Sequence, residues 1–202
     1  QRGSLYYTQE RFDDFYMGKG STYPDLHGAV GILFEQASSR GHVQRNDNGL
    51  LRFHETIANQ FATSLSSLRA TTDLREELHS FKRDFYNESM KRARSGKVKT
   101  FIFSSPGNRT RLENFADVLL RHDIKCYWPE QQFAVGKRSF DPRWTLLVPA
   151  IQPEYRFIKS LLMRRKSFKE NVFYDVSSWT LPLAYDLEQT GSPETIDVSE
   201  MR

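Results

Sequence analysis

The chain has 202 residues, which is enough for one domain or two small domains with a sizeable hydrophobic core. Lysine and arginine outnumber aspartate and glutamate by 29 to 25, and this small excess does not indicate nucleic-acid binding. The single cysteine, Cys126, excludes an internal disulfide. No apolar run reaches the roughly 20 residues that a membrane-spanning helix needs. We therefore expect neither a nucleic acid nor a membrane as partner.

The N-terminal region contains a glycine-rich loop followed by the apolar run at residues 29–34, which predicts a buried strand ending on Glu35. An ionised carboxylate at the edge of such a strand loses solvation unless a partner compensates it. This cost favours a functional position for Glu35. The alternative is that Glu35 is simply the first residue of the run to reach solvent.

Two helices are predicted after this strand. Ile57, Phe61, Leu65 and Leu68 recur at helical spacing, so a helix begins near Glu55. A second set of apolar residues shares one face of the next helix, which should end near residue 94 before a Ser-Gly stop. The members of that set are Leu74, Leu78, Phe81 and Phe85.

From Lys97 onward, the pattern alternates between strands and helices. It predicts strands at residues 98–105, 124–128, 144–150 and 171–176, a helix that starts near Thr110 and carries Leu112, Phe115 and Leu119, and a helix at 153–165. Thr110 and Glu113 have the spacing of a capping box. This alternation predicts a largely parallel, layered sheet. We place domains at residues 1–95 and 96–187, with a flexible tail at 188–202.

Common catalytic motifs are missing from the chain. None of the five histidines has a zinc-motif spacing, no HExxH or GxSxG sequence occurs, and Cys126 has no evident base beside it. The loop at residues 104–110 lies between a strand and a helix, where Arg109 would help to hold an anion. An ordinary tight turn explains the same loop.

Residues 13–41, DDFYMGKGSTYPDLHGAVGILFEQASSRG, resemble the C-terminal part of the catalytic domain of M14 (carboxypeptidase A-like) zinc carboxypeptidases. In that family a mobile tyrosine precedes a Gly-Ser-containing loop, and a strand then delivers the catalytic glutamate. The resemblance covers about residues 5–70. Residues 97–187 resemble the additional α/β domain that follows the peptidase domain in some bacterial M14-like proteins.

The resemblance implies that Glu35 is the general base and that Tyr16 contacts the substrate, a peptide or an amide. The interval between them, 35 − 16 = 19 residues, is a little shorter than is usual in the family, so Tyr23 is the alternative tyrosine. In the family, two histidines and a glutamate hold zinc and activate its bound water, while a further carboxylate takes the proton. The implied fold is α/β, with part of a mixed-sheet zinc-carboxypeptidase-like domain followed by a small layered α/β domain.

The family's HxxE zinc pair, later histidine ligand and carboxylate-gripping arginine cannot be matched in this chain. We therefore expect zinc only in a full-length parent protein, with the N-terminal half of the peptidase domain as the partner and little activity from this chain alone. The competing hypothesis is a noncatalytic α/β interaction module in which Glu35 caps a strand. Substrate preference, oligomeric state and a cytoplasmic or periplasmic location stay open. Residues 174–187, with Trp179, are expected to pack against the peptidase half.

Overall fold

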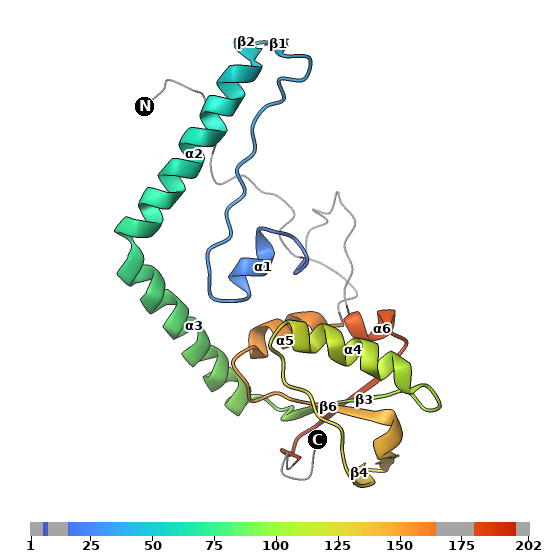
Figure 1. Cartoon of the computed structure of the whole chain (residues 1–202). Helices are drawn as coiled ribbons and strands as arrows, with labels where there is room; N and C mark the ends of the chain where they lie inside the picture. Colours follow the sequence, from blue (N-terminus) through green and yellow to red (C-terminus); the bar gives the residue numbers. More distant parts are fainter. Residues whose placement is uncertain (1–5, 8–15, 165–179, 197–202) are drawn as a thin grey trace.

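The structure, a computed structural model, describes residues 6–7, 16–164 and 180–196 and is a mixed α/β protein with small antiparallel sheets (Figure 1). Two long helices form an arm beside a compact C-terminal unit. In chain order the elements are α1 (Thr22–Asp25), β1 (Val43–Asn46), β2 (Gly49–Arg52), α2 (Phe53–Asp73), α3 (Arg75–Ser95), β3 (Thr100–Ser104), α4 (Arg109–Arg121), β4 (Phe133–Val135), β5 (Arg138–Phe140), the 3-10 helix η1 (Pro142–Trp144), β6 (Thr145–Pro149), α5 (Tyr155–Leu162), α6 (Leu181–Ala184) and β7 (Glu188–Ser192).

The sheet of the C-terminal unit has the strand order β6-β3-β7, and both strand pairs are antiparallel. The expected largely parallel sheet is therefore wrong. Tyr127 forms an antiparallel bridge with Leu147 on β6, so residues around 127 run in the same direction as β3. The expected common direction of β3 and the segment around residue 127 was correct. These two segments do not pair with each other, however, because β6 lies between them and is antiparallel to both. Only this single bridge remains of the strand predicted at 124–128.

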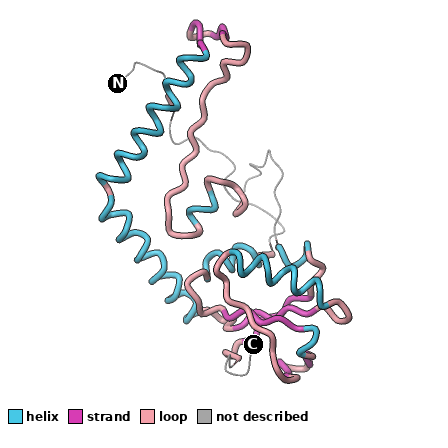
Figure 2. Tube along the Cα trace, viewed as in Figure 1, coloured by secondary structure: helices cyan, strands magenta, loops and turns pink. Residues whose placement is uncertain are grey.

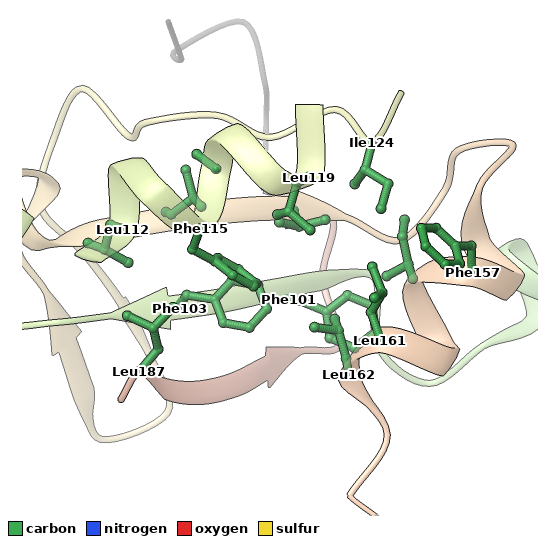
Figure 3. Packing of buried hydrophobic residues seen from close by; sticks show 14 of the residues in the cluster. Phe101, Phe103, Leu112, Phe115, Leu119, Ile124, Phe157, Leu161, Leu162 and Leu187 are labelled. Atoms are coloured by element: carbon green, nitrogen blue, oxygen red, sulfur yellow. The ribbon is translucent and has the colours of Figure 1, made fainter. Parts of the chain in front are cut away.

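The central strands are buried on both faces of this sheet. Phe101 and Phe103 face a large core formed with α4 and α5, which cover one side (Figure 3). Ile102, between them in sequence, belongs to a smaller cluster with Phe140 of β5 and Leu147 of β6. Burial on both faces explains why β3 and β6 are continuous apolar runs rather than alternating ones.

The arm consists of α2 and α3, which confirm the two predicted helices. The N-terminus of α2 is fixed by Glu55, whose carboxylate accepts a 2.7 Å hydrogen bond from the Arg52 backbone N–H. Helix α3 is attached to the C-terminal unit, because the Ser89 hydroxyl donates to the Pro153 carbonyl oxygen at 2.7 Å. Most of α2, by contrast, lies away from the compact unit (Figure 1).

Residues 29–38 form no strand, although a buried strand was predicted at 29–34. The segment is an extended loop that runs to the β1–β2 hairpin at the far end of α2 (Figure 2). Its apolar side chains are exposed, from 49% at Phe34 to 60% at Ile32. The reason is physical: an apolar run is buried in a sheet only where neighbouring strands exist, and the described residues supply none here.

Two further expectations are tested in the C-terminal half of the chain, and a third falls outside the described residues. Helix α4 starts one residue before Thr110, and its N-cap is Asn108, whose side chain accepts from the Arg111 backbone N–H. Residues 188–192 form β7, so a flexible tail is wrong there; the strand escaped prediction because its polar side chains give no hydrophobic signal. The predicted strand at 171–176 and Trp179 lie outside the described residues. Nearby Leu181 and Tyr185 pack against the C-terminal core.

Candidate functional site

The segment that carries Glu35 is held at its start by a compact turn after α1. The Ala29 backbone N–H donates to the Pro24 carbonyl oxygen at 3.0 Å, and the Gly31 N–H donates to the Asp25 carboxylate at 2.7 Å. A Cβ atom on Gly31 would lie 1.7 Å from the Ser21 carbonyl oxygen, so only glycine fits there. These contacts fix the chain up to Gly31 and leave Glu35 beyond the fixed part.

Glu35 lies on the exposed part of the segment. Its side chain makes no hydrogen bond or ion pair within the described residues, and the preceding Phe34 is half exposed. The carboxylate is thus exposed and stabilises no contact among the described residues. Its availability fits either a functional group or a residue that has simply reached solvent.

Tyr16 is not brought to Glu35. Its ring is partly buried against the C-terminal core, next to the buried Met17. The alternative tyrosine, Tyr23, is also engaged, because its hydroxyl lies 2.8 Å from Nδ1 of His122. Neither tyrosine forms a site with Glu35 here.

A second cluster of polar groups was missed from the sequence. His27, after α1, places Nδ1 3.1 Å from the Glu154 carboxylate, which is nine-tenths buried. The ring of Phe157 packs against His27 at 4.6 Å and against His122 at 5.1 Å between ring centroids. We call Tyr23, His27, Tyr86, His122 and Glu154 the clasp cluster. Its members come from α1, α3, the end of α4 and the start of α5, so no sequence spacing could have revealed it.

The clasp cluster changes the titration of its own members. Burial, followed by the nearby Glu154 carboxylate, raises the pKa of Tyr86 to about 12. Burial and the neighbouring His27 lower the pKa of His122. The Tyr86 hydroxyl also lies 3.3 Å from the His27 carbonyl oxygen. These shifts favour the neutral forms of Tyr86 and His122, and the contacts of the cluster tie the turn before Glu35 to the C-terminal unit.

A groove of about 550 Å³ lies between the extended segment and α2. It is bridged by two side-chain hydrogen bonds, from Ser39 to Thr56 at 2.9 Å and from Asn59 to Gln36 at 3.1 Å. The groove has no charged lining residue; it is lined by Gln36, Ala37, Ser38, Ser39, Phe53, Thr56, Ile57, Gln60, Phe61 and Ser64. Apolar and uncharged polar groups thus continue from residues 36–39 onto α2.

The loop at residues 104–110 is an ordinary turn with an engaged arginine. The Arg109 guanidinium lies 3.3 Å above the Trp128 ring centroid. It also donates to the Arg143 carbonyl oxygen at 3.1 Å and pairs with Glu113 at 3.3 Å. Because the Arg109 guanidinium already makes these contacts, it does not support the alternative that this loop binds an anion.

Zinc does not fit the residues that the structure describes. Across residues 6–7, 16–164 and 180–196, no three histidine, cysteine or carboxylate side chains come close enough to hold a metal ion. Cys126 is partly buried, and burial raises the pKa of its thiol to about 11, which disfavours the thiolate that metals bind. In the same ranges, no helix has the length and apolar character needed to cross a membrane.

Comparisons of the chain with protein-family models, curated proteins and solved structures gave no match.

Proposed function

We propose that this chain is the C-terminal part of an M14-like zinc carboxypeptidase and that Glu35 is its general base. One observation carries the proposal: the chain is fixed as far as Gly31, while the Glu35 carboxylate beyond it has no partner among the described residues. A carboxylate that serves only the local fold would be expected to pair there. The resemblance of residues 13–41 supplies the reaction.

The role of Glu35 itself is proton transfer. A solvated carboxylate with hydrogen-bond reach to an attacking water accepts one proton as the water oxygen bonds to the substrate carbonyl carbon. The same proton then passes to the leaving amine as the C–N bond breaks, which returns Glu35 to its ionised form. Peptide and amide bonds are the substrate class. Contact of Tyr16 with the substrate stays a prediction.

The zinc that this family uses needs ligands from outside the described residues, because these form no zinc site. We therefore propose that the ligands belong to the N-terminal half of the peptidase domain in the parent protein. The carboxypeptidase-like fold belongs to the same proposal, since residues 29–38 form no sheet in this chain. The chain alone should be inactive and should bind no stoichiometric zinc.

The test is a Glu35→Gln variant of the parent protein. We expect kcat/KM for a peptide substrate to fall by about 100-fold or more, while the zinc content per chain stays unchanged. Glu77→Gln on the exposed surface of α3 is the charge-matched control and should keep full activity. A Glu35→Gln enzyme with wild-type kcat/KM would contradict the proposal.

A noncatalytic interaction module is the second candidate, and the exposed apolar surface of α2 and residues 30–34 favours it. Zinc analysis of the parent protein separates the two. One zinc per parent chain supports the peptidase, whereas a parent without zinc leaves Glu35 with no metal to act beside and favours the interaction module.

A further inference from the structure

The turn at residues 22–31, which precedes Glu35, is closed by hydrogen bonds between its own residues. The Ala29 N–H donates to the Pro24 carbonyl oxygen at 3.0 Å, and the Gly31 N–H donates to the Asp25 carboxylate at 2.7 Å. Because these bonds link the start of the turn to its end, a contact that holds the middle of the turn also determines the position of Gly31.

A buried histidine–carboxylate pair joins this turn to the C-terminal unit. Nδ1 of His27 lies 3.1 Å from Oε2 of Glu154, and the two side chains are only 20% and 10% exposed. An ionised carboxylate at this depth needs a compensating group, and the His27 imidazole supplies one. His27 belongs to the turn, whereas Glu154 lies at the start of α5. The pair therefore connects the turn to the C-terminal unit.

Helix α3 makes two further contacts with the same turn. The Tyr86 hydroxyl donates to the His27 carbonyl oxygen at 3.3 Å. Gly28 has a φ of +65°, and a Cβ atom there would lie 3.1 Å from the Phe85 ring, so the backbone of the turn packs directly against this side chain. Helix α3 is itself attached to the C-terminal unit through Ser89. These contacts therefore hold the turn against the same part of the molecule as Glu154 does.

Glu35 lies between two attachment points of the chain. The first is Gly31, at the end of the turn. The second is Gln36, whose side chain accepts a 3.1 Å hydrogen bond from the Asn59 amide on α2. Only residues 32–35 lie between these points, and four extended residues span at most about 14 Å. The position of Glu35 therefore depends on both attachments, and without the first one only the contact with α2 would remain.

From these contacts we infer that Glu154 and His27 are positioning residues through which the C-terminal unit holds Glu35 in place for proton transfer. The inference rests on the proposed function of Glu35, and it gives the C-terminal unit a part in that reaction. A general base must lie within hydrogen-bond reach of the attacking water, and a misplacement of about 1 Å can cost about 100-fold in rate. Release of the turn would slow the reaction although the Glu35 carboxylate is still present.

The first test measures amide exchange by NMR in the 202-residue chain. Glu154→Gln keeps the shape of the side chain but removes its charge, and we expect the Ala29 and Gly31 amides to exchange at least about 10-fold faster. Tyr86→Phe should act in the same direction more weakly. Glu77→Gln, exposed on α3, is the charge-matched control and should change neither amide. Protection of β3 in each variant shows that the C-terminal unit is folded. Unchanged exchange in Glu154→Gln overturns the inference.

The second test measures peptide hydrolysis by the parent protein. Glu154→Gln should lower kcat per bound zinc at least about 10-fold and leave KM within about twofold, because positioning of the base acts on the chemical step. Glu154→Asp, which keeps the carboxylate, should recover part of this loss. In a Glu35→Gln parent, Glu154→Gln should have no further effect, since its effect passes through Glu35.

The activity of the double variant separates positioning from a general structural role. If Glu154→Gln lowers kcat by the same factor with and without Glu35→Gln, its role is only structural and the inference is overturned. An unchanged kcat in Glu154→Gln, beside a Glu35→Gln parent that has lost activity, overturns the inference and leaves the proposed function standing. A fully active Glu35→Gln parent overturns the proposed function and the positioning role together.

Discussion

At the residue scale, the clasp cluster makes the stability of the fold depend on the protonation of Tyr86. Tyr86 keeps its proton in the folded chain, because burial and Glu154 raise its pKa from 10.0 to about 12. A group whose pKa is higher in the folded state stabilises that state below its unfolded pKa and loses the contribution as pH rises through the folded value. The stabilisation by Tyr86 should therefore be complete below pH 10 and disappear between pH 10 and about pH 12.

Tyr86→Phe tests this alkaline behaviour. Subtraction of the variant's ultraviolet titration from that of the wild type should isolate one phenol that ionises near pH 12. The free energy of unfolding of the variant should also fall less steeply above pH 10 than that of the wild type. A Tyr86 phenol that titrates at 10 would show that Tyr86 is not buried beside Glu154.

Gly31 is the second residue with a sharp expectation. A side chain there would collide with the Ser21 carbonyl oxygen, so Gly31→Ala must displace the backbone of the turn. We expect a local cost of about 1–3 kcal/mol, as for other overpacked sites. Faster amide exchange at residues 21–31 would report it. Gly20→Ala is the control, because a Cβ there meets nothing within 4 Å, and equal exchange in both variants would contradict the expected clash.

At the element scale, Asn108 and Thr110 offer competing caps for α4. The structure uses Asn108, so Asn108→Ala should cost about 1 kcal/mol in the free energy of unfolding. Thr110→Ala should change it by less than about 0.5 kcal/mol, because Thr110 already lies inside the helix. Urea unfolding monitored by circular dichroism measures both. A larger loss for Thr110→Ala would restore the capping box expected from the sequence.

The elements that the sequence predicted well are those with one dominant local signal. Helix α2 follows from the spacing of Ile57, Phe61 and Leu65, and β3 follows from a continuous apolar run. The antiparallel pairing did not follow, because it depends on β6 entering between β3 and the residues around Tyr127. The hydrophobic periodicity of a segment does not indicate which distant segment it pairs with.

The candidate sites likewise divide into those with a local sequence signal and those formed by residues far apart in the sequence. Glu35 became a candidate because a carboxylate ends an apolar run, which is a contrast between neighbouring residues. The pair formed by His27 and Glu154 was missed because each residue looks ordinary in its own segment and the two meet only through tertiary packing. The prediction of a buried strand before Glu35 was wrong for a third reason. The run at residues 29–34 is apolar, as a buried strand requires, but the described residues provide no neighbouring strand that would bury it.

At the scale of the whole molecule, apolar side chains fall into two classes with different energetic roles. Phe115 is fully buried in the C-terminal core, with its ring centroid 4.8 Å from that of Phe103. Phe61 on α2 is 61% exposed. The same residue type therefore contributes much to the stability of the chain at one position and little at the other.

Phe115→Ala and Phe61→Ala measure this difference directly. In the 202-residue chain, Phe115→Ala should lower the free energy of unfolding by about 3–5 kcal/mol, because it removes buried surface and leaves a cavity. Phe61→Ala should change it by less than about 0.5 kcal/mol, since the ring is largely solvated already. Urea unfolding of the wild-type chain and of these two variants measures both effects. A loss for Phe61→Ala as large as that for Phe115→Ala would show that Phe61 is buried in the folded chain, contrary to its 61% exposure.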